Sequence, residues 1–239
     1  MLQMETQLSQ LRLHGMSRAW RNLLETRKHQ ELSLTEGLEM LLMSEQNERE
    51  KRRYDRLKKS ARFRYQASIE QLDYGPSRGL DKSVITRLAT GDYLTRGESI
   101  LITGATGCGK SYLATALGYQ ACHQGVKVAY YNTHKLLTRC ALSRVDGTFI
   151  KLFDKISKTD LIILDDFGLT PINAQQQLDL MEIIEDRHAQ KATIIASQLP
   201  VSHWFDVIQD ATIADAILDR LTHTSHRIEL KGDSLRKKM

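Results

Sequence analysis

The sequence has little of what marks secreted, metal-binding or membrane proteins. Its 239 residues include only three cysteines, Cys108, Cys122 and Cys140, an odd number without the spacing of metal ligands. The N-terminus does not have the pattern of a signal peptide, so we expect a cytoplasmic protein in a reducing compartment. A stretch of about 18 uninterrupted apolar residues is also missing, and we therefore expect no membrane-spanning segment.

Glycine and proline are missing from residues 38–74, and this absence favours long helices. Apolar residues recur at helical spacing from Leu8 to Leu24, and Ser33-Leu34-Thr35-Glu36 has the form of a capping box that opens a further helix. We expect residues 1–72 to form a small all-helical domain for DNA binding or assembly. The glycines and proline of residues 73–79 mark a linker, which begins a second domain over 73–239.

Charge is distributed unevenly along the chain. The net charge is +5, yet residues 49–65 alone hold nine basic side chains against two acidic ones, so this basic run carries +7 and the rest of the chain −2. A local excess of one sign, with Tyr54 and Tyr65 among the charges, favours binding to nucleic acid; a solvated helix face is the alternative. The predicted DNA contacts are Arg49, Arg52, Arg53, Arg56, Lys58, Lys59, Arg62 and Arg64.

Residues 73–239 alternate between predicted helices and strands. The strands are expected at 99–103, 126–131, 160–165, 192–197 and 226–230. The helices are expected at 81–94, 110–123, 133–141, 147–157, 173–189, 201–208 and 212–223. Such alternation predicts an α/β fold, a parallel sheet covered by helices on both faces.

A phosphate-binding loop follows the first of these strands. Gly104 to Ser111 match the pattern G-x-x-x-x-G-K-S in full, between an apolar strand and an amphipathic helix. Glycines let backbone N–H groups converge on an anion, and the next helix offers its positive end. Lys110 is predicted to reach the β- and γ-phosphates of ATP and Ser111 to bind Mg²⁺. The predicted nucleotide contacts are Gly104, Ala105, Thr106, Gly107, Cys108, Gly109, Lys110, Ser111 and Tyr112.

Acidic and polar residues follow two later strands. Leu161 to Leu164 form a buried strand that ends in Asp165 and Asp166, and ligands bind at this edge of parallel sheets. We expect Asp165 to orient Mg²⁺ and Asp166 to polarise the attacking water. The strand at 192–197 ends in Ser197 and Gln198, which are candidates to bond that water or the γ-phosphate, or else to form a simple turn.

One helix near the end of the chain presents a candidate catalytic arginine. Arg220 is predicted to project away from its own phosphate-binding loop, and an arginine supplied to a neighbouring subunit stabilises transition-state charge. A salt bridge with Asp215 or Asp219 is the competing interpretation. Arg227 is a rival for the same catalytic role.

Together these segments resemble a known family. GATGCGKS, LIILDDFG, ASQLP and ILDRLTHTSHRIEL, after a basic helical module ending in LDYG, are similar to the IstB-like ATPases, the helper proteins of one class of bacterial insertion sequences. The resemblance implies an AAA+ domain of the initiator and helicase-loader clade, with Gly104–Ser111 as Walker A, Asp165 and Asp166 as Walker B, Ser197 and Gln198 as sensor and Arg220 as arginine finger. It also implies ATP and Mg²⁺ as cofactors.

The resemblance further implies partners. They are double-stranded DNA, a separate DDE-type transposase and copies of the same chain in a ring or helical filament, which would bring the protein to the nucleoid. The chain leaves no room after its last strand for the helical lid of many AAA+ proteins, so neighbouring subunits are expected to close the site. Asp166 stands where AAA+ proteins usually have glutamate.

Three other functions compete with this one. A replicative helicase loader of the DnaC type has a similar ATPase domain. The N-terminal module of a loader must bind a helicase, whereas the module of this chain carries a strongly basic run suited to phosphates. A small-molecule kinase would leave that run and Arg220 unexplained. A non-hydrolysing DNA-binding switch would fit the shorter side chain of Asp166.

Overall fold

The computed structural model describes residues 2–235. Residue 1 of the first expected domain and residues 236–239 of the second lie outside the described residues. The chain divides into two compact units, one that runs to Arg56 and one that begins at Leu57. The sequence predicts the division between residues 72 and 73, whereas the contacts join residues 57–72 to the second unit. Part of the basic run therefore belongs to the unit that holds the phosphate-binding loop.

The first unit is helical, as the sequence predicts. It contains α1 (Leu2–Gln10), α2 (His14–Glu25), the short 3-10 helix η1 (Lys28–Gln30) and the beginning of α3 (Leu34–Ala61). The expected capping box is present before α3. The Ser33 N–H donates to the Glu36 carboxylate at 2.8 Å, and the Glu36 N–H donates to the Ser33 hydroxyl at 3.3 Å.

Helices α2 and α3 approach each other closely at Gly15. A Cβ atom at this position would lie 2.3 Å from the Ser44 carbonyl oxygen, so no side chain fits there. The Ser44 hydroxyl donates to the Gly15 carbonyl at 2.9 Å. The buried Glu45 carboxylate accepts the N–H groups of Gly15 and Met16 at 2.7 and 3.3 Å, and so satisfies the first turn of α2.

Helix α3 ends earlier than the sequence predicts. The expectation that residues 1–72 are all helical is wrong for residues 62–68, because Arg62 takes a left-handed conformation with φ of 56° and helix returns only in the short η2 (Ile69–Gln71). The chain then turns so that the Phe63 ring stacks on Tyr119 of α6 (Lys110–His123), with ring centroids 4.6 Å apart. This ring contact holds the chain after the end of the helix, so Arg62 and Arg64, the last basic residues of the run, lie on a loop.

The second unit is built on a five-stranded parallel sheet with the order β2-β3-β4-β1-β5. Its strands are β1 (Ser99–Gly104), β2 (Val128–Asn132), β3 (Leu161–Phe167), β4 (Ala192–Ser197) and β5 (Ser225–Leu230). All five predicted strands are confirmed within two residues. Because β2 and β3 are parallel neighbours, Asn132 lies beside Asp165 at the carboxyl ends of their strands.

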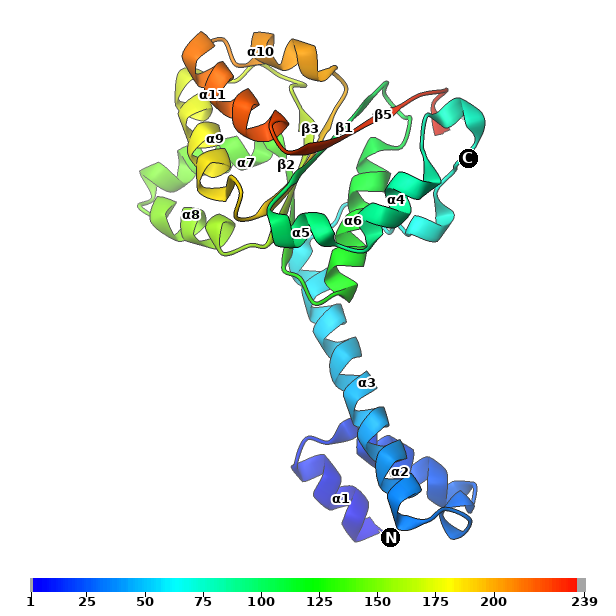
Figure 1. Ribbon diagram of the computed structural model, residues 1–239. Coiled ribbons are helices and arrows are strands. Elements are labelled where there is room, and N and C mark those ends of the chain that lie inside the picture. Colours follow the sequence, from blue (N-terminus) through cyan, green and yellow to red (C-terminus); the bar gives the residue numbers. More distant parts are fainter. Residues whose placement is uncertain (1, 236–239) are drawn as a thin grey trace. The chain divides into compact units, whose positions relative to one another are not determined.

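Helices connect and cover the strands of this sheet (Figure 1). They are α4 (Lys82–Ala89), α5 (Asp92–Arg96), α6 (Lys110–His123), α7 (Thr133–Val145), α8 (Phe149–Ser157), α9 (Ala174–Arg187), α10 (Trp204–Val207) and α11 (Ala211–Thr222), with 3-10 helices η2 (Ile69–Gln71), η3 (Pro76–Arg78) and η4 (Val201–His203). The helix predicted at 81–94 is two helices, because Gly91, with φ of 88°, turns the chain between them. Within residues 2–235 no helix has the length and apolarity needed to cross a bilayer.

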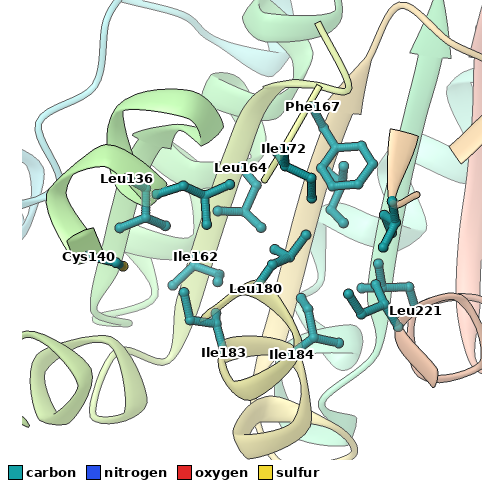
Figure 2. Packing of buried hydrophobic residues seen from close by; sticks show 14 of the residues in the cluster. Leu136, Cys140, Ile162, Leu164, Phe167, Ile172, Leu180, Ile183, Ile184 and Leu221 are labelled. Carbon is teal, nitrogen blue, oxygen red and sulfur yellow. The ribbon is translucent and has the colours of Figure 1, made fainter. Parts of the chain in front are cut away.

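The core of this unit lies against both faces of the sheet. Ile162 and Leu164 of β3 pack with Leu180 of α9 in a large cluster that also draws on α7 and α11 (Figure 2). Ile163, between them in sequence, lies beneath α6 at Gly118. Successive strand residues thus point to opposite faces, and the burial on both sides holds the carboxyl ends of the strands in place.

Candidate functional site

The phosphate-binding loop has the conformation that its glycines predict. Gly104, Gly107 and Gly109 have φ angles of 144°, 82° and 102°, in a region that side chains rarely allow. A Cβ atom on Gly104 would also lie 2.2 Å from the Leu230 carbonyl oxygen. The loop joins β1 to α6, with Gly109 directly before the first turn of the helix. Backbone N–H groups and the helix N-terminus therefore meet at one anion-binding point.

Lys110 is held within this loop. Its ammonium donates to the carbonyl oxygens of Gly104 and Ala105, each at 2.8 Å, and the residue is 8 % exposed. The positive charge of Lys110 is therefore held at the same loop whose backbone N–H groups converge on the anion-binding point. A nucleotide phosphate can take the place of those carbonyl contacts.

Ser111 at the start of α6 and Asp165 of β3 lie in contact with each other. The Ser111 hydroxyl donates to the Asp165 carboxylate, with 2.9 Å between the oxygens, although 54 residues separate the two in sequence. A hydroxyl and a carboxylate are hard oxygen donors of the kind that Mg²⁺ prefers beside nucleotide phosphates. The residues present therefore fit Mg²⁺ and ATP.

The Asp165 carboxylate is buried and fixed from several sides. Its Oδ1 also accepts the N–H of Asp166 at 2.9 Å, and its Oδ2 accepts the hydroxyl of Tyr130. The Thr133 hydroxyl donates to the Asp165 carbonyl at 2.8 Å. Burial, and then the adjacent carboxylate, raises the pKa of Tyr130, so its hydroxyl keeps its proton and stays a donor.

Asp166 has an unusual backbone conformation for its residue type. Its φ is 57°, in the left-handed region, where a non-glycine residue is uncommon and strain concentrates at functional sites. Its carboxylate accepts the Asn132 side-chain amide at 2.8 Å and faces the Arg64 guanidinium at 3.7 Å. The two predicted acids thus have different surroundings: Asp165 is buried and Asp166 partly open.

The two predicted sensor residues have different environments. The Gln198 side chain accepts the Thr106 hydroxyl at 2.7 Å, which brings it to the phosphate-binding loop. The Ser197 hydroxyl is fully buried and donates to the Phe167 carbonyl at 2.8 Å, while it accepts the Leu199 N–H at 3.0 Å. Ser197 thus joins the ends of β3 and β4, and Gln198 contacts the loop.

Arg220 forms an ion pair, but with a residue that the sequence did not suggest. Its guanidinium faces Glu185 of α9 and donates to the Ala216 carbonyl at 2.9 Å, and its side chain is 26 % exposed. The partners considered from the sequence, Asp215 and Asp219, lie on its own helix. The rival Arg227 is exposed on β5.

The basic run is partly neutralised by nearby acids. Arg49 pairs with Glu45 at 2.8 Å and Arg52 with Glu48 at 2.9 Å, each one helical turn apart. The arginine side chains stay 65 % and 48 % exposed, so they remain open to solvent. Their acidic partners are largely buried, at 7 % and 14 % exposed, so each pair presents its arginine to solvent.

Lys58 and Arg64 of the same run lie in the second unit. The Lys58 ammonium lies 5.1 Å from the centroid of the Tyr119 ring on α6. Arg64 reaches the nucleotide site, where it pairs with Asp166. The sequence predicts only DNA contacts for both residues.

Arg78 is a site residue that sequence reasoning missed. It is 7 % exposed, and it donates to the Cys108 carbonyl at 2.7 Å and to the Asp233 carbonyl at 2.9 Å. The Leu235 N–H adds a bond to the Gly107 carbonyl at 3.0 Å. The linker and the segment after β5 therefore brace the phosphate-binding loop, a role that no local pattern around Arg78 signals.

Tyr130 and Asn132 were also missed, although a signal for them exists. Both are at the end of β2, and β2 is the neighbour of the strand that carries Asp165. Tyr112, which stays a predicted nucleotide contact, directs its hydroxyl to Gln71 at 2.9 Å and accepts the Ser68 N–H at 3.3 Å.

The order of the sheet, the glycine loop between β1 and α6 and the acids that end β3 define a P-loop NTPase of the AAA+ class. The chain belongs to the family described as IstB-like ATP binding protein, whose model matches residues 6–239. Both the predicted fold class and the predicted family are confirmed.

Two curated relatives carry insertion-sequence names. The chain is 42 % identical over 230 residues to the insertion sequence ATP-binding protein y4pL of Sinorhizobium fredii, covering 96 % of this chain and 94 % of that protein. It is 30 % identical over 238 residues to the insertion sequence IS21 ATP-binding protein of Pseudomonas aeruginosa, covering 100 % and 90 %. The relatives are described as ATP-binding proteins of mobile elements.

Solved structures share the fold. AMPPCP-bound DnaA from Aquifex aeolicus matches with a TM-score of 0.61 at 20 % identity, covering 73 % of this chain and 53 % of that chain. The DnaC helicase loader matches with a TM-score of 0.58 at 18 % identity, covering 74 % and 99 %. The chain thus spans about half of the DnaA chain.

Proposed function

We propose that this protein is an ATP-hydrolysing helper of transposition. In this proposal it binds double-stranded DNA, assembles on it as a homo-oligomer, a ring or a helical filament, and cooperates with a DDE-type transposase in target selection. The observation that carries the ATPase part is the 2.9 Å contact between Ser111 and Asp165, with Asp166 next in the chain. The insertion-sequence names of the relatives support the role in transposition.

The site residues have distinct roles in the proposed hydrolysis. Lys110 and the loop N–H groups hold the β- and γ-phosphates, and Ser111 and Asp165 hold Mg²⁺. When bound, Mg²⁺ supplies charge that stabilises the phosphoryl group in transfer. Asp166 orients and polarises the attacking water, and Gln198, which contacts the loop through Thr106, is assigned to the γ-phosphate.

Closure of the site is assigned to a neighbouring subunit. Arg220 would leave Glu185 and reach the nucleotide of the adjacent subunit, where its charge stabilises the transition state. Hydrolysis should then rise faster than linearly with protein concentration. DNA should lower the concentration required, because it aligns subunits along its backbone.

DNA binding is assigned to the basic run and is tested by its salt dependence. Each phosphate contact should contribute about 0.9 to the log–log slope of affinity against salt, with little dependence on DNA sequence. Replacement of Arg52, Arg53, Lys58 and Lys59 by glutamine should flatten that slope.

A matched variant with Arg87, Lys151, Lys155 and Lys158 replaced by glutamine removes the same charge from other exposed positions and should change the salt slope little. An unchanged slope in the first variant would move the DNA site elsewhere, with Lys135, Arg139 and Arg144 the next candidates.

Cooperation with a transposase is tested directly by strand transfer. The purified transposase of the same element should insert into target DNA more efficiently when this protein and ATP are present. The Lys110→Ala protein is the control and should give no stimulation. Binding to a replicative helicase in place of the transposase would support the loader function instead.

A further inference from the structure

The end of the basic run lies at the catalytic acid. Arg64 faces the Asp166 carboxylate at 3.7 Å, on the oxygen that also accepts the Asn132 amide at 2.8 Å. Both Arg64 and Asp166 belong to the second compact unit. Arg49 and Arg52, earlier in the same run, pair with acids one helical turn before them. A side chain predicted for DNA therefore contacts the residue assigned to hydrolysis.

The residues next to Arg64 are anchored to the nucleotide-binding unit. Phe63 stacks on Tyr119 of α6 at 4.6 Å, and the Tyr119 hydroxyl donates to the Tyr65 carbonyl at 3.4 Å. The Arg64 guanidinium also lies 5.2 Å from the centroid of the Tyr65 ring. The backbone on both sides of Arg64 is thus fixed, while its own side chain is 55 % exposed and open to solvent.

Two anions can compete for this one cation. A carboxylate and a DNA phosphate are both good partners for a guanidinium, and an exposed pair is held weakly enough to be exchanged. While Arg64 faces Asp166, it attracts the carboxylate and competes with water for the oxygen. When a DNA phosphate binds Arg64, the Asp166 carboxylate loses this ion pair and keeps its hydrogen bond from Asn132. It can then accept a hydrogen bond from the attacking water.

We propose that Arg64 is a positioning residue that links DNA binding to ATP hydrolysis, because its guanidinium is shared between Asp166 and a DNA phosphate. This inference rests on the proposed DNA-dependent ATPase function. The coupling is reciprocal: if DNA draws Arg64 from Asp166, then removal of the Asp166 charge must make Arg64 available and strengthen DNA binding. That consequence appears without any nucleotide.

The test is a double-mutant cycle on affinity for a short duplex of random sequence, in the absence of ATP. Asp166→Asn should bind the duplex roughly two- to fivefold more tightly than the parent chain and increase its salt slope by about 0.9. In an Arg64→Gln background the same change should have no effect beyond that of added net charge. Asn is well suited to the left-handed backbone of residue 166, so this variant keeps the fold.

The matched control is Asp186→Asn, which removes an exposed acid of α9 and corrects for net charge. If Asp166→Asn strengthens DNA binding no more than this control, or does so equally in the Arg64→Gln background, the inference is overturned while the proposed function stands. A parent chain that does not bind DNA would overturn both. The two failures are therefore distinguishable.

ATP turnover gives the second measurement. At a protein concentration high enough for the subunits to assemble without DNA, Arg64→Gln should raise the DNA-free rate toward the DNA-stimulated rate of the parent chain, so that saturating DNA adds less than about twofold. Arg87→Gln removes an exposed cation of α4 and should leave the stimulation at its parental value. An Arg64→Gln protein with an unchanged basal rate and full stimulation by DNA would contradict the proposal.

Discussion

The Tyr130 hydroxyl donates a hydrogen bond to the Asp165 carboxylate, on the oxygen that Ser111 leaves free. The tyrosine is 9 % exposed, and burial first and the carboxylate second raise its pKa. It therefore remains a neutral donor at the acid assigned to Mg²⁺. Such an outer contact sets the orientation of a metal ligand without touching the metal.

We accordingly expect Tyr130→Phe to weaken Mg²⁺ binding by about 10- to 100-fold. The Mg²⁺ concentration at half-maximal turnover, measured at saturating ATP, gives the effect. Tyr131→Phe is the matched control, because that tyrosine packs against the hydrophobic core. An equal Mg²⁺ requirement in the Tyr130→Phe and parent proteins would remove Tyr130 from this role.

Arg220 supports a prediction about mixed oligomers. Arg220→Ala should leave ATP binding by the monomer intact and suppress turnover, because the cation acts in the neighbouring site. Mixing it with Asp166→Asn should restore activity, since an intact Asp166 on one subunit can then meet an intact Arg220 on the next. Steady-state phosphate release of the two variants, alone and mixed, measures this.

The comparison variant for this experiment is Arg227→Ala, which replaces the exposed rival on β5. Complementation of Asp166→Asn by this variant, where Arg220→Ala shows none, would transfer the role to Arg227. The contradicting outcome is a mixture no more active than the sum of the separate Arg220→Ala and Asp166→Asn proteins, under conditions where mixed oligomers form. Arg220 would then act only within its own subunit, where it pairs with Glu185.

Glu45 gives a prediction about the stability of the first unit. Burial alone would raise the pKa of this carboxyl, but hydrogen bonds from Arg49 and from the N–H groups of Gly15 and Met16 lower it below its ordinary value of 4.5. A lowered pKa in the folded state means that the stabilisation is complete above about pH 4.5 and is lost as pH falls through the lower value. Acid should therefore loosen α2 from α3.

Glu45→Gln should remove about 2 kcal/mol of stability from these contacts at neutral pH and abolish their acid dependence. Hydrogen exchange of residues 14–25, corrected for the intrinsic effect of pH, reports the opening of α2 in the full chain. Glu39→Gln, on the exposed side of α3, is the control. Parental protection of α2 in the Glu45→Gln protein at neutral pH would contradict this account.

The parts predicted from sequence are those fixed by local patterns. The phosphate-binding loop needs glycines at set positions, and a buried parallel strand needs a run of apolar residues, so Gly104–Ser111, Asp165 and the five strands were found. The end of α3 was missed because it depends on Phe63 meeting Tyr119, more than 50 residues away. Arg78 was missed for the same reason.

The partners of charged residues were the hardest to predict. A sequence shows that Arg64 and Arg220 are basic, but their partners Asp166 and Glu185 come close only when the sheet and its helices are assembled. The position of Asn132 beside Asp165 could have been inferred once β2 and β3 were taken as neighbours. Strand order was the missing information.

The central claim is that this site binds ATP through Lys110 and hydrolyses it through Asp166, and the most direct test measures both steps on the same samples. Nucleotide binding and phosphate release should be measured for the parent chain, Lys110→Ala and Asp166→Asn with Mg²⁺ and DNA present. The account predicts that Lys110→Ala loses binding and turnover together, whereas Asp166→Asn binds ATP normally and loses turnover by at least about 100-fold. Parental turnover in Asp166→Asn, or parental ATP binding in Lys110→Ala, would contradict it.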